Sequence, residues 1–220
     1  MSTERERRSH ILEVAERLLR HYGPQKTTIA EIARAAEVGV GTVYLEFPSK
    51  EAIVEELSIE RHSVVLDAMR QALANGPSFV DRVRAVFDAR LAAYIKLDAE
   101  GAHARDLVHC MNPAVRAAHG RFKQDELALL SELLRQGVAA GECALVVSVD
   151  DAAAALLMAY VSFSPPYVFG AKARELERRL HALHTLVVDG LRPRTASRAS
   201  AASASSKGAI KRKSPRPRTH

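Results

Sequence analysis

The sequence predicts an all-α protein. Apolar residues recur every three to four positions through most of the 220-residue chain, as they do along one face of an α-helix, and clusters of Gly, Pro, Asn and Ser separate these periodic segments. No segment alternates apolar and polar residues as a half-buried β-strand does, and only residues 145–147 are ambiguous. The chain is long enough to bury a sizeable core without a disulfide framework or a structural metal.

Three helices are expected first, of which the second and third are short. An amphipathic segment begins after Thr3, which together with Glu6 fits a capping box, and it ends near residue 22. A second helix follows Thr28, because a threonine hydroxyl can accept a free N–H group at a helix start, and it continues to about residue 36. The third runs from about residue 40 to Phe47.

Longer helices follow. Pro48-Ser49 ends the third helix and caps the fourth. The remaining predicted helices span about residues 50–74, 78–97, 114–140, 150–163 and 176–190, with a short helix ahead of Asn112. Residues 150–163 are apolar nearly all round, which indicates burial on more than one side.

Residues 29–47 have the spacing of a helix-turn-helix, with two helices of about eight residues joined by a turn of three. The small Ala33 allows the second helix to cross close to the first, and Val43 and Phe47 would fix the crossing angle from the other side. The second helix would then enter the major groove of DNA.

The motifs in this region support that interpretation. The string Thr27-Thr28-Ile29-Ala30-Glu31-Ile32-Ala33, followed by Gly41-Thr42-Val43-Tyr44 and by Phe47-Pro48-Ser49-Lys50-Glu51-Ala52, closely resembles the N-terminal DNA-binding domain of the TetR family of bacterial transcriptional regulators. The resemblance covers residues 10–57. It implies a homodimer whose recognition helices bind a palindromic double-stranded operator, and a small-molecule effector that releases it. Repression is the expected mode, with activation as the other option.

The resemblance also implies which residues contact DNA: Thr28, Gly41, Thr42, Val43, Tyr44 and Lys50. A hydroxyl or ammonium group beside a helix N-terminus suits phosphate, and Gly41 leaves no side chain between helix and duplex. Three alternatives stay open: Thr28 as a plain cap, Tyr44 as a core aromatic and Lys50 as a solvated surface charge.

Five positions in the turn and the recognition helix depart from the family pattern, and Pro24 stands where the family often has an aromatic residue. Glu37 replaces a turn glycine, so the turn is either less relaxed or reaches its geometry without a left-handed residue. Gly39 replaces a capping serine. Val40, Leu45 and Glu46 replace polar or basic residues, so base recognition is expected to depend on apolar contact with thymine methyl groups and on few hydrogen bonds.

Positive charge is concentrated at one end of the chain. The net charge is +6, from 32 Lys and Arg against 26 Asp and Glu, but residues 192–220 carry nine basic residues and no acid. This segment is too poor in apolar residues to order, and its charges either add nonspecific DNA affinity or follow a minor groove. The alternative function is therefore a DNA-organising protein that binds DNA through this tail and responds to no effector. Near the N-terminus, Arg5, Arg7 and Arg8 either reach phosphates or form a solvated arm.

These observations divide the chain into a DNA-binding domain at residues 1–48, a helical ligand-binding and dimerisation domain at 49–191, and a basic disordered tail at 192–220. The apolar segment 152–163 and the face made by Leu176, Leu180, Leu183 and Val187 predict the dimer interface. The charged N-terminus and the two cysteines predict a cytoplasmic protein with no membrane partner. The resemblance implies that it is bacterial and nucleoid-associated.

An effector pocket is expected among the central helices. Its candidate lining residues are His62, Phe87, Tyr94, His103, Met111, Phe122, Met158 and Tyr160. They favour an apolar or amphipathic ligand, although core packing explains the same residues.

Metal and enzyme chemistry are weaker alternatives. His103 and His109 with Cys110, or His181 with His184, raise metal sensing, but neither set completes a ligand constellation, so no metal and no cofactor is expected. No complete enzyme motif is present, and no catalytic residue is assigned.

Overall fold

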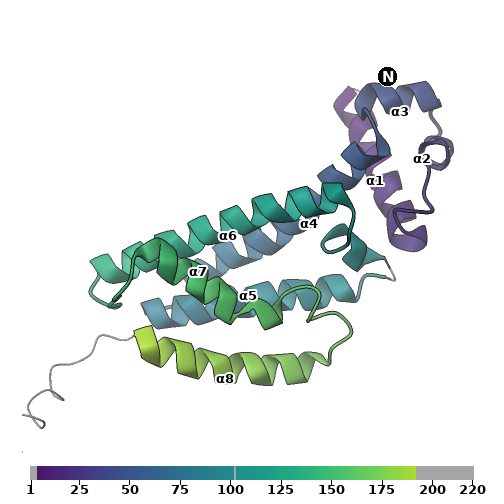
Figure 1. Ribbon diagram of the computed structural model, residues 1–220. Helices are drawn as coiled ribbons and strands as arrows, with labels where there is room; N and C mark the ends of the chain where they lie inside the picture. Colours follow the sequence, from purple (N-terminus) through teal and green to yellow (C-terminus); the bar gives the residue numbers. More distant parts are fainter. Residues whose placement is uncertain (1–3, 102, 192–220) are drawn as a thin grey trace, which may run out of the picture.

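The computed structural model describes residues 4–101 and 103–191 (Figure 1). The predicted basic tail and the predicted capping residue Thr3 lie outside the described residues. All regular elements in the described ranges are helical, as predicted. The α-helices are α1 (Glu4–Tyr22), α2 (Ile29–Ala35), α3 (Val40–Glu46), α4 (Lys50–Ala72), α5 (Phe79–Asp98), α6 (Pro113–Ala139), α7 (Val149–Ala159) and α8 (Ala173–Leu191). Short 3-10 turns lie at Leu73–Asn75, Ala104–Leu107 and Val161–Phe163.

Most helices begin at a side chain that caps them. The hydroxyls of Ser49, Ser78 and Ser148 each accept a hydrogen bond from a backbone N–H group in the first turn of α4, α5 and α7. The Asn112 carbonyl oxygen accepts one from the N–H of Ala114, 2.8 Å away, and Pro113 occupies the first turn of α6, where its missing N–H costs nothing. The helix starts therefore follow from local sequence.

Two predicted helices are shorter than expected. The α-helical part of the fourth ends at Ala72, and a 3-10 turn completes it. The segment predicted as one helix over 150–163 is α7 followed by a break at Tyr160, whose buried ring stacks on Phe87. The ambiguous residues 145–147 form no strand, and Val146 is 98% exposed.

The helices form two parts joined by α4. Figure 1 shows α1, α2 and α3 gathered at one end, with α4 running from them into a helical bundle and α8 along the opposite edge of that bundle. In the bundle α4 packs mainly against α6 and α5, and α7 packs on α6.

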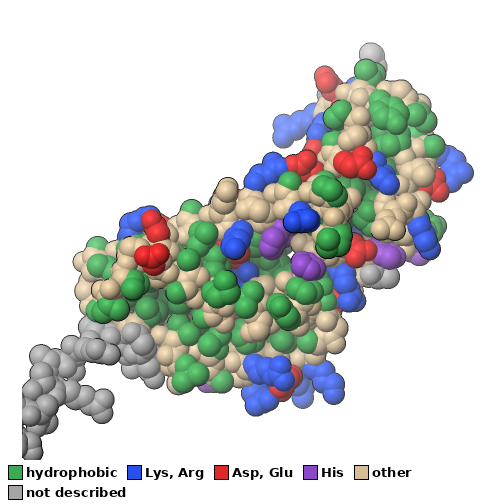
Figure 2. Space-filling model, in the orientation of Figure 1, with side chains coloured by type: hydrophobic (Ala, Val, Ile, Leu, Met, Phe, Trp, Pro, Cys, Tyr) green, Lys and Arg blue, Asp and Glu red, His purple; other side chains and the backbone are tan. Residues whose placement is uncertain are grey.

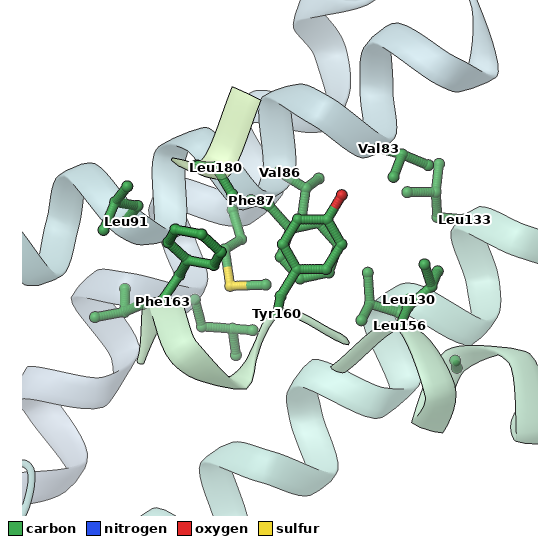
Figure 3. Close-up of a cluster of buried hydrophobic side chains, with 14 of the residues drawn as sticks. Val83, Val86, Phe87, Leu91, Leu130, Leu133, Leu156, Tyr160, Phe163 and Leu180 are labelled. Atoms are coloured by element: carbon green, nitrogen blue, oxygen red, sulfur yellow. The ribbon is translucent and has the colours of Figure 1, made fainter. Parts of the chain in front are cut away.

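The bundle core is filled by large side chains from α5, α6, α7 and α8 (Figure 3). The rings of Phe87 and Tyr160 stack with their centroids 3.7 Å apart. At one end of the core, Gly137 on α6 lies against the Phe79 ring, and a Cβ atom there would come within 2.4 Å of it. This close approach requires glycine in the last turn of α6.

The apolar core of the N-terminal part extends beyond residue 48. It includes Ile53, Val54 and Leu57 from the start of α4, and also Leu107 and Val115 from the segment between α5 and α6. The α5–α6 connection therefore packs directly on the helix-turn-helix region.

A membrane-spanning helix would have to be long and apolar, and none of the helices in the described ranges meets both conditions.

Candidate functional site

The helix-turn-helix is built from α2, a short turn and α3. Thr28 caps α2: its hydroxyl accepts a hydrogen bond from the Glu31 N–H, 3.2 Å away, and its own N–H donates to the Glu31 carboxylate at 2.8 Å. The bond from the Thr28 N–H holds the pKa of Glu31 below its ordinary value. Ala33 and Val43 are buried at the crossing of the two helices, as the sequence predicted.

The turn contains the one non-glycine residue with positive φ in the described ranges. Glu37 has φ of 55°, in the left-handed region that favours glycine. Its neighbour Val38 donates to the carbonyl of Ala33 at 3.0 Å, which closes the turn. Of the two expectations for this position, the structure shows the strained one, because the turn keeps the left-handed geometry and a glutamate adopts it.

The outer face of α3 is apolar and uncharged. Val40 is 43% exposed, Tyr44 53% and Leu45 84%, and no other described atom lies within 4 Å of a Cβ built on Gly41. Apolar side chains gather at this end of the molecule in Figure 2. The face therefore offers two aliphatic side chains, a phenol and bare backbone.

Glu46 does not belong to this face. Its side chain is 4% exposed and accepts a hydrogen bond from Arg7 Nε at 2.7 Å, with Arg7 Nη2 at 2.6 Å. Arg7 on α1 therefore neutralises Glu46 and holds it away from the outer face of α3. Arg8 pairs with Glu56 and stacks over Phe47, so neither arginine forms a solvated arm.

The predicted DNA-contacting residues divide into three groups. Thr28, Gly41 and Tyr44 are exposed, and Thr42 is half-buried. The alternative of Tyr44 as a core aromatic is wrong. Val43 has no exposed surface, so its placement among the residues that touch DNA is corrected: it positions α3 from inside the core.

Lys50 makes contacts that the sequence did not predict. Its ammonium group donates to the carbonyl oxygens of Pro24, at 2.8 Å, and Thr27, at 3.2 Å. Lys50 therefore fastens the start of α4 to the loop between α1 and α2, and it is not a plain solvated charge. A phosphate contact from the same ammonium stays a prediction.

The eight candidate pocket residues do not surround one cavity. His62, Phe87, Tyr94, Phe122 and Tyr160 are buried and pack the bundle core. In contrast, Met158 is 66% exposed and Met111 83% exposed, and His103 pairs with Asp106 beside the N-terminal part. The prediction of a common lining is thus wrong for these three, because composition alone does not tell which helix faces meet.

Beside this apolar core lies a cluster of buried polar groups. Arg90 and Glu126 form a buried ion pair, and Arg90 Nη1 also donates to the Ser164 hydroxyl at 2.6 Å. His62 stacks on Phe122 with ring centroids 4.7 Å apart. Burial, with a smaller effect of His119, lowers the pKa of His62 to about 3, so its ring is neutral at physiological pH.

A second buried chain involves one of the histidines considered for metal sensing. His184 shares a hydrogen bond of 2.8 Å with the Tyr160 hydroxyl through Nδ1, and one of 3.0 Å with Asp88 through Nε2. Both ring nitrogens are therefore engaged within the protein, whereas His181 is exposed. The described residues contain no group of three or more side chains placed to hold a metal ion.

A family model described as bacterial regulatory proteins of the tetR family matches residues 11–57. This range contains all of α2 and α3 and the first turns of α4. Among curated protein sequences, none is significantly similar to this chain.

Several solved structures share the whole fold. The fatty acid degradation regulator FadR from Bacillus halodurans is 21% identical, with a TM-score of 0.62 over 88% of this chain and 100% of that one. A transcriptional regulator from Cytophaga hutchinsonii is 20% identical, with a TM-score of 0.63 over 84% and 98%. FadR from Bacillus subtilis, solved in complex with stearoyl-CoA, is 19% identical, with a TM-score of 0.59 over 84% and 99%.

A three-helix domain that exposes the second helix of a helix-turn-helix, joined to a helical bundle, defines a DNA-binding transcriptional regulator. Residues 11–57 match the DNA-binding domain of the TetR family of bacterial transcriptional regulators, and the described helices share the fold of solved regulators.

Proposed function

We propose that this protein is a homodimeric repressor whose two α3 helices bind the halves of a palindromic operator. The observation that carries the proposal is the exposed face of α3, where Val40, Tyr44 and Leu45 stand uncovered around the open backbone of Gly41. An α-helix with such a face fits the major groove, and apolar side chains there contact the methyl group of thymine. Thr28 and Thr42 supply hydroxyls for the DNA backbone.

Dimerisation is supported by an apolar surface at the edge of the bundle. The α8 face predicted to form the dimer interface packs on the bundle core instead, so that prediction is wrong: Leu176 and Leu180 are buried, and Leu183 and Val187 pack against the same core. A different side chain of α8, Leu186, is 75% exposed. Met158 on α7 and Val161 just after it are also exposed. A second copy of the same surface would cover these side chains in a two-fold symmetric contact.

The bundle, residues 49–191, is the proposed ligand-binding domain, and residues 1–48 are the proposed DNA-binding domain. The stearoyl-CoA complex of Bacillus subtilis FadR supports an amphipathic effector for this fold. Half-sites one helical turn apart require recognition helices about 34–36 Å apart, or a modest extension of that spacing. An effector that favours another spacing would shift the population away from the DNA-bound arrangement.

The test begins with selection of a preferred operator from random duplex DNA, followed by fluorescence anisotropy with the purified protein. Tyr44→Ala is expected to weaken binding at least tenfold, whereas Tyr22→Ala is expected to leave it unchanged. Tyr22 is a matched control because it is 52% exposed and lies at the far end of α1, beside the α5–α6 connection. Equal binding by both variants would contradict the proposed interface.

The DNA-organising alternative predicts a different result. A protein that acts through its basic tail would yield no preferred sequence, and removing residues 192–220 would abolish its DNA binding. A repressor keeps its operator preference after that truncation and loses only nonspecific affinity. Analytical ultracentrifugation tests the dimer, which Leu186→Asp is expected to dissociate.

A further inference from the structure

A surface hollow of about 750 Å³ lies where the bundle meets the N-terminal part. In Figure 2 histidine side chains gather beside a hollow in this region. It is formed by the α5–α6 connection, the first two turns of α6 and the loop before α8. Its lining residues are Val108, His109, Cys110, Met111, Val115, Arg116, His119, Gly120 and Pro165.

The lining combines apolar walls with one sign of charge. Val108, Met111, Val115 and Pro165 supply an apolar surface, whereas the ionisable nitrogen groups are the guanidinium of Arg116 and two imidazoles. No carboxylate is among the described residues that line the hollow. Burial lowers the pKa of His119 most, and the nearby His109, Arg90 and Lys123 lower it further.

Unpartnered polar groups lie directly behind this wall. The Nδ1 atom of His119 is buried without a hydrogen-bond partner, and its ring centroid lies 5.4 Å from that of His62. His62 is 3% exposed, and neither of its ring nitrogens has a partner. Buried polar groups normally find partners, so several together indicate a place for a ligand's polar atoms.

We propose that this hollow binds a monocarboxylic acid with an apolar chain. The carboxylate would lie between Arg116 and His119, which donate hydrogen bonds to it, and the chain would cover Val108, Val115 and Pro165. That this ligand is the effector that releases DNA rests on the function proposed above. The neighbouring Arg90 is already neutralised by Glu126, so the carboxylate is left to Arg116 and the imidazoles.

The composition of the site favours this class over other anions. A phosphate dianion needs several charged donors to replace its hydration, and the lining holds one guanidinium. A neutral apolar molecule would offer no acceptor to Arg116 and His119, so it gains less from the same walls. A monocarboxylate with an aliphatic chain places its charge against Arg116 and His119 and its chain against the apolar lining residues.

The test is titration calorimetry of the full-length protein with octanoate and with octanamide, its neutral isostere. Octanoate is expected to bind at least tenfold more tightly than octanamide. Replacing both donors, Arg116→Gln with His119→Gln, is expected to weaken octanoate at least tenfold and to leave octanamide unchanged. The control variant Arg121→Gln changes an arginine of the same helix that pairs with Glu55 instead, and it should bind octanoate like the parent. Thermal unfolding of each variant checks that it is folded.

Equal affinity for the acid and the amide would overturn the proposal, and so would octanoate binding that survives the double substitution. Failure of octanoate, butanoate and decanoate to bind a protein that still holds its operator would also overturn it, while the proposed DNA binding would stand. Octanoate that binds but leaves the operator complex intact would support the site and contradict the proposed release by an effector.

Discussion

Replacing Leu45 tests whether the apolar face of α3 contacts bases. Leu45 is the most exposed aliphatic side chain of that helix, with 84% of its surface uncovered in the free protein. Full burial of a leucine side chain contributes about 1.5–3 kcal/mol, and alanine keeps one carbon of it, so the loss is about 1–2 kcal/mol per subunit. For a dimer on two half-sites this amounts to about 2–4 kcal/mol, or roughly 30- to 800-fold in affinity.

The partner in the DNA can be changed as well. Deoxyuridine in place of thymidine removes only the 5-methyl group, which is worth about 0.8 kcal/mol in each half-site, or about 15-fold for the palindrome. The assay is fluorescence anisotropy on the selected operator, with the substitution moved through each thymine. At one thymine per half-site the parent should lose this factor, and Leu45→Ala should lose almost nothing more, because the contact is already gone.

Val146→Ala is the matched control, since Val146 is 98% exposed in the loop after α6 and far from the helix-turn-helix. Its affinity for the operator should equal that of the parent. A contact between Leu45 and a thymine methyl group is refuted if Leu45→Ala binds within threefold of the parent, or if no thymine in the operator is sensitive to loss of its methyl group. Additive losses from the two changes would show that Leu45 acts elsewhere.

Three further predictions concern stability. Glu37→Gly relieves a left-handed backbone conformation that costs a residue with a side chain about 1–2 kcal/mol, and the flexibility of glycine in the unfolded chain offsets about 0.5–1 kcal/mol of this gain. Urea unfolding should therefore show a net gain in stability of about 0.5–1 kcal/mol. Glu37→Ala should show no such gain, because alanine keeps a side chain at this position. Gly137→Ala forces a methyl group into the Phe79 ring and should lower the free energy of unfolding by about 1–3 kcal/mol. Gly120 lies in open space on the same helix, so Gly120→Ala should raise the free energy of unfolding by about 0.5–1 kcal/mol. Equal effects of the two substitutions would contradict the packing at Phe79. His62 binds a proton near pH 6.5 in the unfolded chain but only near pH 3 in the folded protein. The free energy of unfolding should therefore fall as the pH drops below 6.5, by about 2 kcal/mol at pH 5. In His62→Leu the decrease over the same pH range should be smaller by about 2 kcal/mol.

Local sequence determines much of this fold. The starts of α4, α5 and α6 follow from Ser49, Ser78 and Asn112-Pro113, because a capping side chain acts on N–H groups two or three residues away. The helix-turn-helix likewise follows from the spacing of small and large apolar residues between Ala33 and Phe47. These features can be predicted without knowing how distant helices pack.

The site depends on contacts that local sequence does not contain. Lys50 bonds a carbonyl 26 residues earlier, and Glu46 is neutralised by an arginine 39 residues earlier. Either residue could have faced DNA as far as spacing shows, since a charged side chain at a helix end suits both roles. Met111 and Met158, both expected to line a pocket among the central helices, are exposed for a related reason. Periodicity marks the apolar face of a helix, but it does not tell whether the fold covers that face.

The proposed ligand site and the DNA-binding domain share part of their structure. Val115 lines the hollow and also belongs to the core of the N-terminal part, and Cys110 lines the hollow while packing on that same core. Cores are close-packed, so a ligand that displaces this segment must also shift the residues it packs on.

A second connection runs through charged side chains. Arg61 on α4 binds Glu100, after the end of α5, at 2.5 Å and also pairs with Glu16 on α1. Arg20 on α1 donates to the backbone carbonyl of Glu100 at 2.5 Å. The end of α5 is thereby tied to both α1 and α4. A ligand at the α5–α6 connection would therefore act on the orientation of the helix-turn-helix relative to α4, the variable that sets the distance between the two α3 helices of a dimer.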